Sequence, residues 1–346
     1  MAVRVYVGMS GGVDSSLTAA LLLEQGYDVT GVYMKNWTQD LPGMRCPWAD
    51  DLADAKRVAV QLGIDFKVFD FENEYRHKVV DYMINEYKAG RTPNPDIMCN
   101  QEVKFKLFLE AALNDGADMI ATGHYARAKE GVLLQAIDTN KDQTYFLYRV
   151  TGEALSKTLF PLGGLTKPHV REMAKERGLY TAGKKDSQGI CFVGKVGIRD
   201  FLSQYVQQSP GEIIDKKSGI VMGHHDGAIF YTLGQRHGLD VGGGLPYYVV
   251  GKDMDMNEVY ITTDLNDEGL WRNVVGLSSV HWINAAPAEG EYDVRVRHRA
   301  PLVKAKLRYQ NDEIILKLDN EQRAVAAGQS VVIYDGDVCL GGGIVV

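Results

Sequence analysis

The first half of the chain alternates between short apolar runs and longer amphipathic segments. The apolar runs have the length of buried strands, which we predict at residues 3–7, 27–34, 66–71 and 118–122. The amphipathic segments repeat apolar positions with a helical period, which predicts helices at residues 17–23, 49–62, 75–87, 98–113 and 167–177. Strands that alternate with helices predict an α/β domain with a parallel sheet, and ligands gather at the carboxyl ends of such strands.

The pattern changes near Ser209-Pro210-Gly211 to short alternating runs and many glycines. We therefore expect an α/β domain at residues 1–205, a small central β-rich domain at residues 206–270 and a C-terminal antiparallel β-barrel at residues 271–346. The runs that predict barrel strands are residues 292–296, 304–309, 314–318 and 330–334, and a short hairpin is expected earlier, at residues 132–137.

The composition is that of a globular protein with a sizeable core. The chain has 346 residues, 45% hydrophobic and 24% charged, with a net charge of −7. No apolar run reaches the length of a membrane span, and the first residues lead into a strand rather than a signal peptide. We expect a cytoplasmic protein without a membrane partner.

The four cysteines, Cys46, Cys99, Cys191 and Cys339, are scattered and form no C-x-x-C pair. This spacing argues against a zinc or iron–sulfur site built from this chain, and a reducing compartment argues against a disulfide framework. We predict no metal site from the protein alone. His224, His225 and His237 are interpreted as surface or turn residues, and Cys339 as a small core residue.

The first strand and helix are joined by a glycine- and serine-rich loop, Gly8-Met9-Ser10-Gly11-Gly12-Val13-Asp14-Ser15-Ser16. Adjacent glycines let backbone N–H groups point inward, and a helix N-terminus favours an anion. No lysine follows the glycines as in a Walker A loop, and G-x-G-x-x-G is absent. The alternative is a glycine turn capped by Asp14 or Ser15. The run resembles the S-G-G-x-D-S signature of the PP-loop ATP pyrophosphatases, which cleave ATP between the α and β phosphates to adenylylate a substrate.

Two later segments carry reactive side chains. Asp96 follows two prolines and is predicted to cap the helix at residues 98–113, which puts Cys99 in its first turn. The helix dipole would favour the Cys99 thiolate; the alternative is a small buried cysteine. His124, after a strand, is either a structural histidine or a site residue. Cys191 ends a polar loop that begins at Lys184.

Several stretches occur together and in the order found in one known family. They are Gly8 to Ser16, Asn94-Pro95-Asp96 with Cys99-Asn100, Gly123 to Arg127, Lys141-Asp142-Gln143, and Asp186 to Phe192. In this combination the chain resembles, from end to end, the bacterial tRNA-specific 2-thiouridylases, which replace O2 of the wobble uridine with sulfur. The resemblance implies a PP-loop, adenine nucleotide α-hydrolase-like catalytic domain.

The resemblance also implies residue roles. The residue matching Cys99 is the nucleophile, that matching Cys191 carries a persulfide, and Asp96 at the target base is a candidate for proton transfer. The ATP-binding candidates are Gly8, Met9, Ser10, Gly11, Gly12, Val13, Asp14, Ser15, Met34 and Gly123. The tRNA-contacting candidates are Asn94, Pro95, Asp96, His124, Lys141, Asp142, Gln143, Arg308, Tyr309 and Gln329. The expected partners are ATP with Mg2+, the anticodon region of tRNA, and a persulfide-donating sulfur carrier or cysteine desulfurase.

A basic stretch in the predicted barrel bears on the tRNA prediction. Between Val294 and Asn311 there are six Lys or Arg residues and no Asp or Glu. A basic face on an acidic protein is either a footprint for a phosphate backbone or a solvated strand face, and the resemblance favours the footprint. Two rival functions remain: a PP-loop ligase acting on a small molecule, and a non-enzymatic RNA-binding protein that senses nucleotide.

Overall fold

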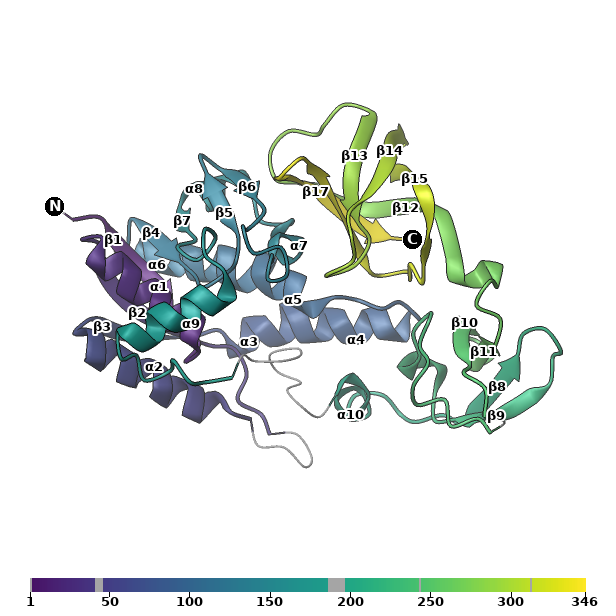
Figure 1. Ribbon diagram of the computed structural model, residues 1–346. Helices are drawn as coiled ribbons and strands as arrows, with labels where there is room; N and C mark the ends of the chain where they lie inside the picture. Colours follow the sequence, from purple (N-terminus) through teal and green to yellow (C-terminus); the bar gives the residue numbers. More distant parts are fainter. Residues whose placement is uncertain (1, 41–45, 186–196, 243, 312) are drawn as a thin grey trace.

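The computed structural model describes residues 2–40, 46–185, 197–242, 244–311 and 313–346. In these ranges the strands form three sheets, one in the N-terminal part, one in the centre and one that includes the C-terminal barrel (Figure 1). This is the architecture predicted from the sequence.

The N-terminal sheet has five parallel strands in the order β3-β2-β1-β4-β7. Their bounds are β1 Arg4–Gly8, β2 Asp28–Lys35, β3 Asp65–Asp70, β4 Met119–Ala121 and β7 Thr158–Leu159. β1 pairs with β2 on one side and with β4 on the other, so the strand order reverses at β1. Loops at such a switch point diverge and leave a crevice at the carboxyl ends of the strands. The glycine-rich loop leaves β1 at this crevice.

Helices cover both faces of this sheet because its central strands are apolar on both faces. Val5 and Val7 pack on one face with α1 Val13–Glu24 and α2 Trp48–Leu62, and α9 Lys167–Glu176 packs beside α1. Tyr6 lies in the core of the other face with the helix α6 Phe108–Asn114.

The two helices predicted at residues 75–87 and 98–113 are present, and each contains a stretch of wider π-helical turns. The first consists of α3 Glu72–Tyr75, η1 Arg76–Val80 and α4 Asp81–Lys88; the second of α5 Pro95–Met98, η2 Cys99–Leu107 and α6. π-Helical turns are frequent at functional sites. In the second helix these turns begin at Cys99.

The predicted hairpin at residues 132–137 is corrected by the structure. Its arms are β5 Arg127–Lys129 and β6 Val132–Leu134, and β6 pairs with β17 Val338–Val345 of the barrel. A hairpin of the N-terminal part therefore extends the C-terminal sheet, a long-range pairing that local patterns do not encode. The short helices α7 Thr144–Leu147 and α8 Gly152–Ser156 follow it.

The central sheet has four strands in the order β10-β11-β8-β9 and its own apolar core, including Ile213 and Val259. Its elements are β8 Gly211–Asp215, β9 Val221–His225, the 3-10 helix η3 Ala228–Phe230, β10 Tyr248–Asp253 and β11 Glu258–Thr262. The boundary predicted at residue 205 falls between α10 Ile198–Leu202 and β8, and the division of the chain into domains stays a prediction.

The C-terminal barrel closes because β12 pairs with both β15 and β17. Its elements are η4 Glu268–Leu270, β12 Trp271–Trp282, β13 Gly290–Arg295, β14 Val303–Gln310, β15 Glu313–Arg323, β16 Ser330–Asp335 and β17. All pairings around the ring are antiparallel, and closure leaves these strands without an open sheet edge. The four strands predicted here are confirmed.

The three parts of the chain meet at Thr92, just before the segment Asn94-Pro95-Asp96. The Thr92 amide donates to Ala327 O of the barrel at 2.8 Å, and its hydroxyl lies 3.2 Å from that of Thr232 in the central part. The barrel turn that carries Gln329 is therefore held beside the start of α5. None of the helices in the described ranges is long and apolar enough to cross a membrane.

Candidate active site

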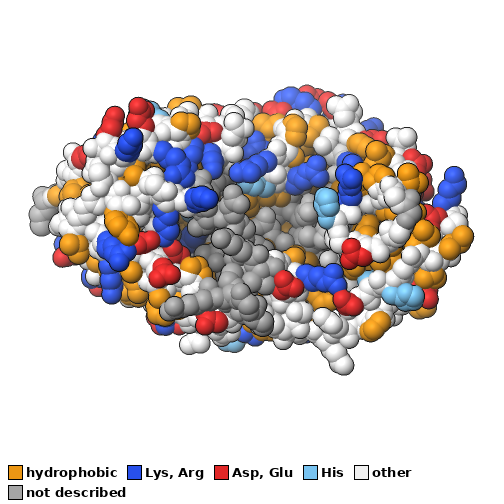
Figure 2. Space-filling view, turned by 60° about the horizontal axis from the view of Figure 1, so that its bottom comes forward, with side chains coloured by type: hydrophobic (Ala, Val, Ile, Leu, Met, Phe, Trp, Pro, Cys, Tyr) orange, Lys and Arg blue, Asp and Glu red, His pale blue; other side chains and the backbone are white. Residues whose placement is uncertain are grey.

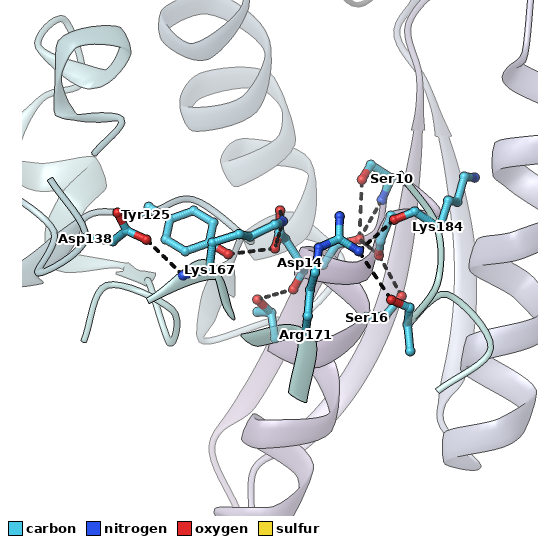
Figure 3. A network of polar contacts seen from close by, with 12 residues as sticks. Ser10, Asp14, Ser16, Tyr125, Asp138, Lys167, Arg171 and Lys184 are labelled. Carbon is cyan, nitrogen blue, oxygen red and sulfur yellow. Dashed lines mark hydrogen bonds and ion pairs between the residues drawn. The ribbon is translucent and has the colours of Figure 1, made fainter. Parts of the chain in front are cut away.

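The loop between β1 and α1, which carries Ser10 and Asp14 (Figure 3), is a tight turn with no room for a side chain at Gly11. Gly11 has φ +71°, and a Cβ there would lie 2.3 Å from the carbonyl oxygen of Asp51. The N-cap of α1 is Gly12, so the alternative of a cap by Asp14 or Ser15 is wrong. A glycine cap has no side chain to satisfy the first-turn N–H groups, which suits an anion.

The serine hydroxyls hold the loop together. The Ser15 hydroxyl accepts from the Ser10 amide at 3.1 Å and lies 3.3 Å from the Ser10 hydroxyl. Ser16 donates to Gly12 O at 2.8 Å. Ser10 is exposed, whereas Ser15 and Ser16 are buried. The hydroxyl of Ser10 is thus the one that faces solvent.

Two further predicted ATP-binding positions lie against this loop. A Cβ at Gly123 would be 2.8 Å from the Ser15 amide nitrogen, and one at Gly8 would be 2.9 Å from Met34 Cε. At Gly123 the neighbouring atoms are backbone, so packing requires glycine there; at Gly8 the close atom is the flexible end of the Met34 side chain, which can shift. The structure brings together all the residues predicted to bind ATP.

Asp14 is held by two residues that the sequence analysis missed. Lys167 Nζ lies 2.7 and 2.8 Å from the two carboxylate oxygens, and the Tyr125 hydroxyl donates to one of them at 2.9 Å (Figure 3). Lys167 is 8% exposed, although it is a lysine. A lysine beside a proline at a helix start gives no sequence signal of this role, because its partner is more than a hundred residues away.

A second ion-pair cluster joins the loop region to Lys184. Its Nζ lies 2.7 Å from Asp51 and 2.8 Å from Asp54 on α2. Burial disfavours the charged form, but the two carboxylates outweigh it and raise the pKa of Lys184. Arg171 donates to Lys184 O at 3.0 Å. These contacts fix the residues just before the segment of Cys191.

The segment at the start of α5 differs from the prediction. Asn94, not Asp96, caps the helix: its side-chain oxygen accepts from the Asp96 amide at 3.1 Å, and Pro95 occupies the first turn. The Asp96 carboxyl is thereby freed from capping. Burial raises its pKa, and the charge of Lys104 opposes the rise. A carboxyl with a raised pKa suits proton transfer.

Cys99 is a buried thiol in this structure. It is 5% exposed, and burial raises its pKa; the positive charge of Lys104 and a hydrogen bond from Tyr75 oppose the rise. The prediction that the helix dipole lowers this pKa is therefore wrong for this conformation. The reason is that α5 starts at Pro95, so Cys99 lies beyond the first turn, where the dipole is strongest, and inside an apolar core.

The other described cysteines are buried as well. In the described ranges Cys46, Cys99 and Cys339 are all free and buried. Cys339 lies in the core, as predicted. Cys191, with the segment from Asp186 to Phe192, lies outside the described residues.

The segment Gly123-His124-Tyr125 connects the glycine-rich loop with η2. Gly123 and Tyr125 contact the loop, while the His124 ring lies 5.6 Å from that of Phe105 on η2. His124 Nδ1 is 2.8 Å from the Thr122 hydroxyl, and burial holds the pKa of His124 well below 6.5. The imidazole is neutral and packed, which agrees with a structural histidine; a contact with tRNA stays a prediction.

In residues 141–143, the partly exposed Lys141 is followed by the buried Asp142. Asp142 is 2% exposed and accepts from Ala136 N, the Thr144 hydroxyl and Arg295 at 2.7 to 3.1 Å. The Gln143 side chain accepts from the Tyr125 amide at 2.9 Å. Asp142 and Gln143 therefore position the turn that presents Lys141.

The basic stretch of the barrel is mostly exposed, and Lys304, Lys306 and Arg308 share one face of β14, but one of its six residues is buried. Arg295 is buried, Lys304 pairs with Asp293 at 3.0 Å, and Arg308 is exposed. Tyr309 is 40% exposed, and its hydroxyl donates to Pro287 O at 2.8 Å. The buried Gln329 side-chain oxygen has no hydrogen-bond partner in the described part of the chain.

No group of three or more His, Cys, Asp or Glu side chains in the described ranges is arranged to hold a metal ion. His225 is buried and its Nδ1 accepts from Gly227 N at 2.9 Å, so it is neither a surface residue nor a ligand here.

Nearly the whole chain matches known families. Residues 3–195 match the family described as tRNA methyl transferase HUP domain. Residues 199–263 match the tRNA methyl transferase PRC-barrel domain, and residues 272–345 match the aminomethyltransferase beta-barrel domain. The fold and these matches define a tRNA-modifying enzyme of the HUP-domain class.

The relatives are more specific. The tRNA-specific 2-thiouridylase MnmA of Bacillus thuringiensis (strain Al Hakam) is 48% identical over 98% of this chain and 93% of the relative. The protein of the same name from Bacillus cytotoxicus is 49% identical over the same shares. The chain belongs to the tRNA-specific 2-thiouridylase family, which consists of tRNA sulfurtransferases, and the resemblance seen in the sequence is confirmed.

Solved structures show weaker similarity. A 4-thiouridine synthetase–RNA complex with bound ATP has a TM-score of 0.38 at 18% identity, covering 58% of this chain and 50% of that chain. A glutamine-dependent NAD+ synthetase from Acinetobacter baumannii in complex with ADP has a TM-score of 0.34 at 17% identity, covering 51% and 28%.

Proposed function

We propose that this enzyme thiolates the wobble uridine of tRNA at O2 in an ATP-dependent reaction, and that the site described above carries it. One observation supports this most strongly: the segment Gly123–Tyr125 contacts both the glycine-rich loop and the helix η2 that begins at Cys99. These contacts support a single site that contains the glycine-rich loop and Cys99.

The loop is suited to bind the phosphates of a nucleoside triphosphate. Its tight backbone at Gly11, the exposed Ser10 hydroxyl and the glycine N-cap of α1 offer N–H and O–H donors to phosphate oxygens. ATP would convert the uracil O2, a poor leaving group, into an adenylate and release pyrophosphate. Mg2+ would be bound mainly by the phosphates, because Asp14 is engaged by Lys167.

The two predicted cysteines would then transfer the sulfur. The terminal sulfur of a Cys191 persulfide would attack C2 of the adenylated base. The bond between C2 and O2 then breaks, and O2 leaves as part of AMP. The Cys99 thiolate attacks Cys191 Sγ and breaks its bond to that sulfur, which forms a Cys99–Cys191 disulfide. An external thiol reductant reopens the disulfide before the next cycle. Because Cys99 is buried with a raised pKa, it must become accessible in this step.

Asp96, Asn94 and Pro95 would meet the target base at the start of α5, where the barrel turn of Gln329 lies close by. Lys141, Arg308 and Tyr309 would contact the tRNA elsewhere. Asp96 has the raised pKa expected of a group that exchanges a proton with the base. We further propose a cytoplasmic enzyme that receives sulfur from a persulfide-donating carrier or cysteine desulfurase.

The test is pyrophosphate release from ATP, measured with and without an unmodified tRNA. We expect release that depends on the tRNA, together with 2-thiouridine when a persulfide donor is supplied. Release that depends on a small amine or acid and not on tRNA would assign a small-molecule ligase. Tight tRNA binding without pyrophosphate release would assign an RNA-binding protein that senses nucleotide.

A further inference from the structure

A pocket of about 510 Å³ lies between the turn at residues 139–141 and the β13–β14 connection of the barrel. Three cationic residues line it: Lys141, Arg295 and Arg299. The remaining lining residues are Thr139, Asn140, Ala300 and Pro301, so the lining contains no carboxylate. Figure 2 shows Lys and Arg side chains gathered along the upper rim of a hollow in the middle of one face of the molecule.

Arg295 is the central observation. It is 7% exposed, and one guanidinium nitrogen donates to Asp142 at 3.1 Å. Its Nε is buried and has no hydrogen-bond partner within the described residues. An unpaired donor on a buried charged group costs about 1–3 kcal/mol, so Arg295 carries an unsatisfied guanidinium beside the pocket that it lines.

Arg299 supplies a second, independent observation. It is exposed, has φ +63°, and makes no hydrogen bond or ion pair with any other described residue. A non-glycine residue in this region of backbone space costs of order 1 kcal/mol and is frequent at ligand-binding sites. The strained backbone places an uncompensated guanidinium at the pocket mouth.

We propose that this pocket binds a phosphate of the tRNA backbone, with Arg295 as the buried donor, Lys141 as the wall and Arg299 at the mouth. The proposal rests on the proposed function and adds a binding site to it. A guanidinium group is planar and can donate two parallel N–H bonds to the oxygens of one phosphate. The pocket also spans the catalytic part and the barrel, so a phosphate held there orients the tRNA relative to both.

The turn that carries Lys141 also reaches the ATP site. The Asp138 carboxylate accepts from the Lys141 amide at 3.2 Å and from the Lys167 amide at 2.9 Å, and Lys167 holds Asp14 in the glycine-rich loop. The pocket wall and the loop are therefore connected through hydrogen bonds. A free phosphate or a nucleotide would share the chemistry of this pocket, and the experiment must separate these sources from tRNA.

The experiment measures tRNA affinity of the full chain at several salt concentrations, and the KM values for ATP and tRNA in pyrophosphate release. Arg299→Ala should weaken tRNA binding about fivefold and reduce the slope of log affinity against log salt by about one. Thr139→Glu, at an exposed position of the lining, should weaken binding further by repulsion. The KM for ATP should not change. The control is Arg272→Ala, an exposed arginine of β12 outside the pocket, which should bind tRNA as the unmodified protein does.

Each alternative has its own result. A raised KM for ATP or competition by millimolar inorganic pyrophosphate, with tRNA affinity unchanged, would assign the pocket to a free anion and overturn the proposal. An equal loss in Arg272→Ala would replace the pocket with a diffuse basic surface. If the unmodified protein forms 2-thiouridine but Arg299→Ala and Thr139→Glu bind tRNA normally, the inference fails while the proposed function stands. If no thiouridine forms, the proposed function itself fails.

Discussion

The ammonium group of Lys167 lies 2.7 and 2.8 Å from the two carboxylate oxygens of Asp14, joining the start of α9 to the first turn of α1. The lysine side chain is 9% exposed and the aspartate side chain 31%. Lys167 therefore orients Asp14 beside the glycine-rich loop, and the two charges compensate each other at the crevice. We therefore expect this ion pair to contribute both to the free energy of unfolding and to the geometry of the loop.

Replacing Lys167 with Met should therefore have two effects. We expect the free energy of unfolding to fall by about 1–3 kcal/mol, since a partly buried carboxylate loses its partner, and pyrophosphate release to fall at least about tenfold. Denaturant unfolding and the release assay measure these effects. The control is Arg177→Met, which breaks a second α1–α9 ion pair, with Glu24, away from the loop. If the control lowers pyrophosphate release equally, the effect comes from helix packing.

The second prediction concerns Gly11. Gly11→Ala should abolish ATP binding and lower stability by about 1–3 kcal/mol, because Gly11 has a positive φ and a Cβ would collide with Asp51 O. The matched control is Gly63→Ala, with φ +66° and no atom within 4 Å of the added Cβ. It should lose only stability. ATP affinity is measured by titration calorimetry; normal affinity in a folded Gly11→Ala protein would remove the loop from the nucleotide site.

The third prediction separates the cysteines. Both Cys99→Ser and Cys191→Ser should stop thiolation, but after incubation with a persulfide donor the first should retain an extra sulfur on Cys191 and the second none. Peptide mass spectrometry and thiouridine analysis measure the two. The control variants Cys46→Ser and Cys339→Ala should lose stability at most, since both residues are buried and neither is assigned a role in the reaction. Sulfur found on Cys99 instead of Cys191 would reverse the roles.

The fourth prediction uses the pKa of Cys99. Because burial raises this pKa, alkylation of Cys99 should be slow at neutral pH and should rise with pH beyond the range of an ordinary cysteine. Lys104 opposes the rise, so Lys104→Met should shift the profile to still higher pH, while Lys104→Arg should restore it. The exposed Lys106, which pairs with Glu102, provides the control Lys106→Met. An unchanged profile in Lys104→Met would mean that this charge does not act on the thiol.

The fifth prediction concerns His124 and stability. Burial holds the pKa of His124 in the folded protein well below 6.5. Below about pH 6.5 the unfolded chain therefore binds a proton at this histidine that the folded protein does not bind. Stability should therefore fall with decreasing pH, by at most ~1.4 kcal/mol per pH unit for this group. His124→Asn, whose amide can still reach Thr122, should make this dependence shallower. His77→Asn, at an exposed position, should not. Equal slopes in all three proteins would contradict the assignment.

The sequence by itself determined most of the regular elements and the glycine-rich loop after β1. Strands such as β1 are apolar on both faces and helices such as α1 follow a local period, so both are encoded within a few residues. The glycines of the loop are also a local requirement, since Gly11 needs a positive φ. These features depend on neighbours in sequence, which is why β1, α1 and the barrel strands were predicted correctly, whereas the hairpin predicted at residues 132–137 was placed a few residues too late in the chain.

Tertiary structure decided what depends on distant partners. Lys167 reaches Asp14 across the fold, β6 joins the barrel through β17, and burial overrides the helix dipole at Cys99. One residue of the basic stretch also depends on a distant partner: Arg295, at the end of β13, is buried against Asp142 rather than exposed. Desolvation and ion pairing arise only when segments far apart in the chain are packed together, and local sequence patterns carry no record of which segments these are.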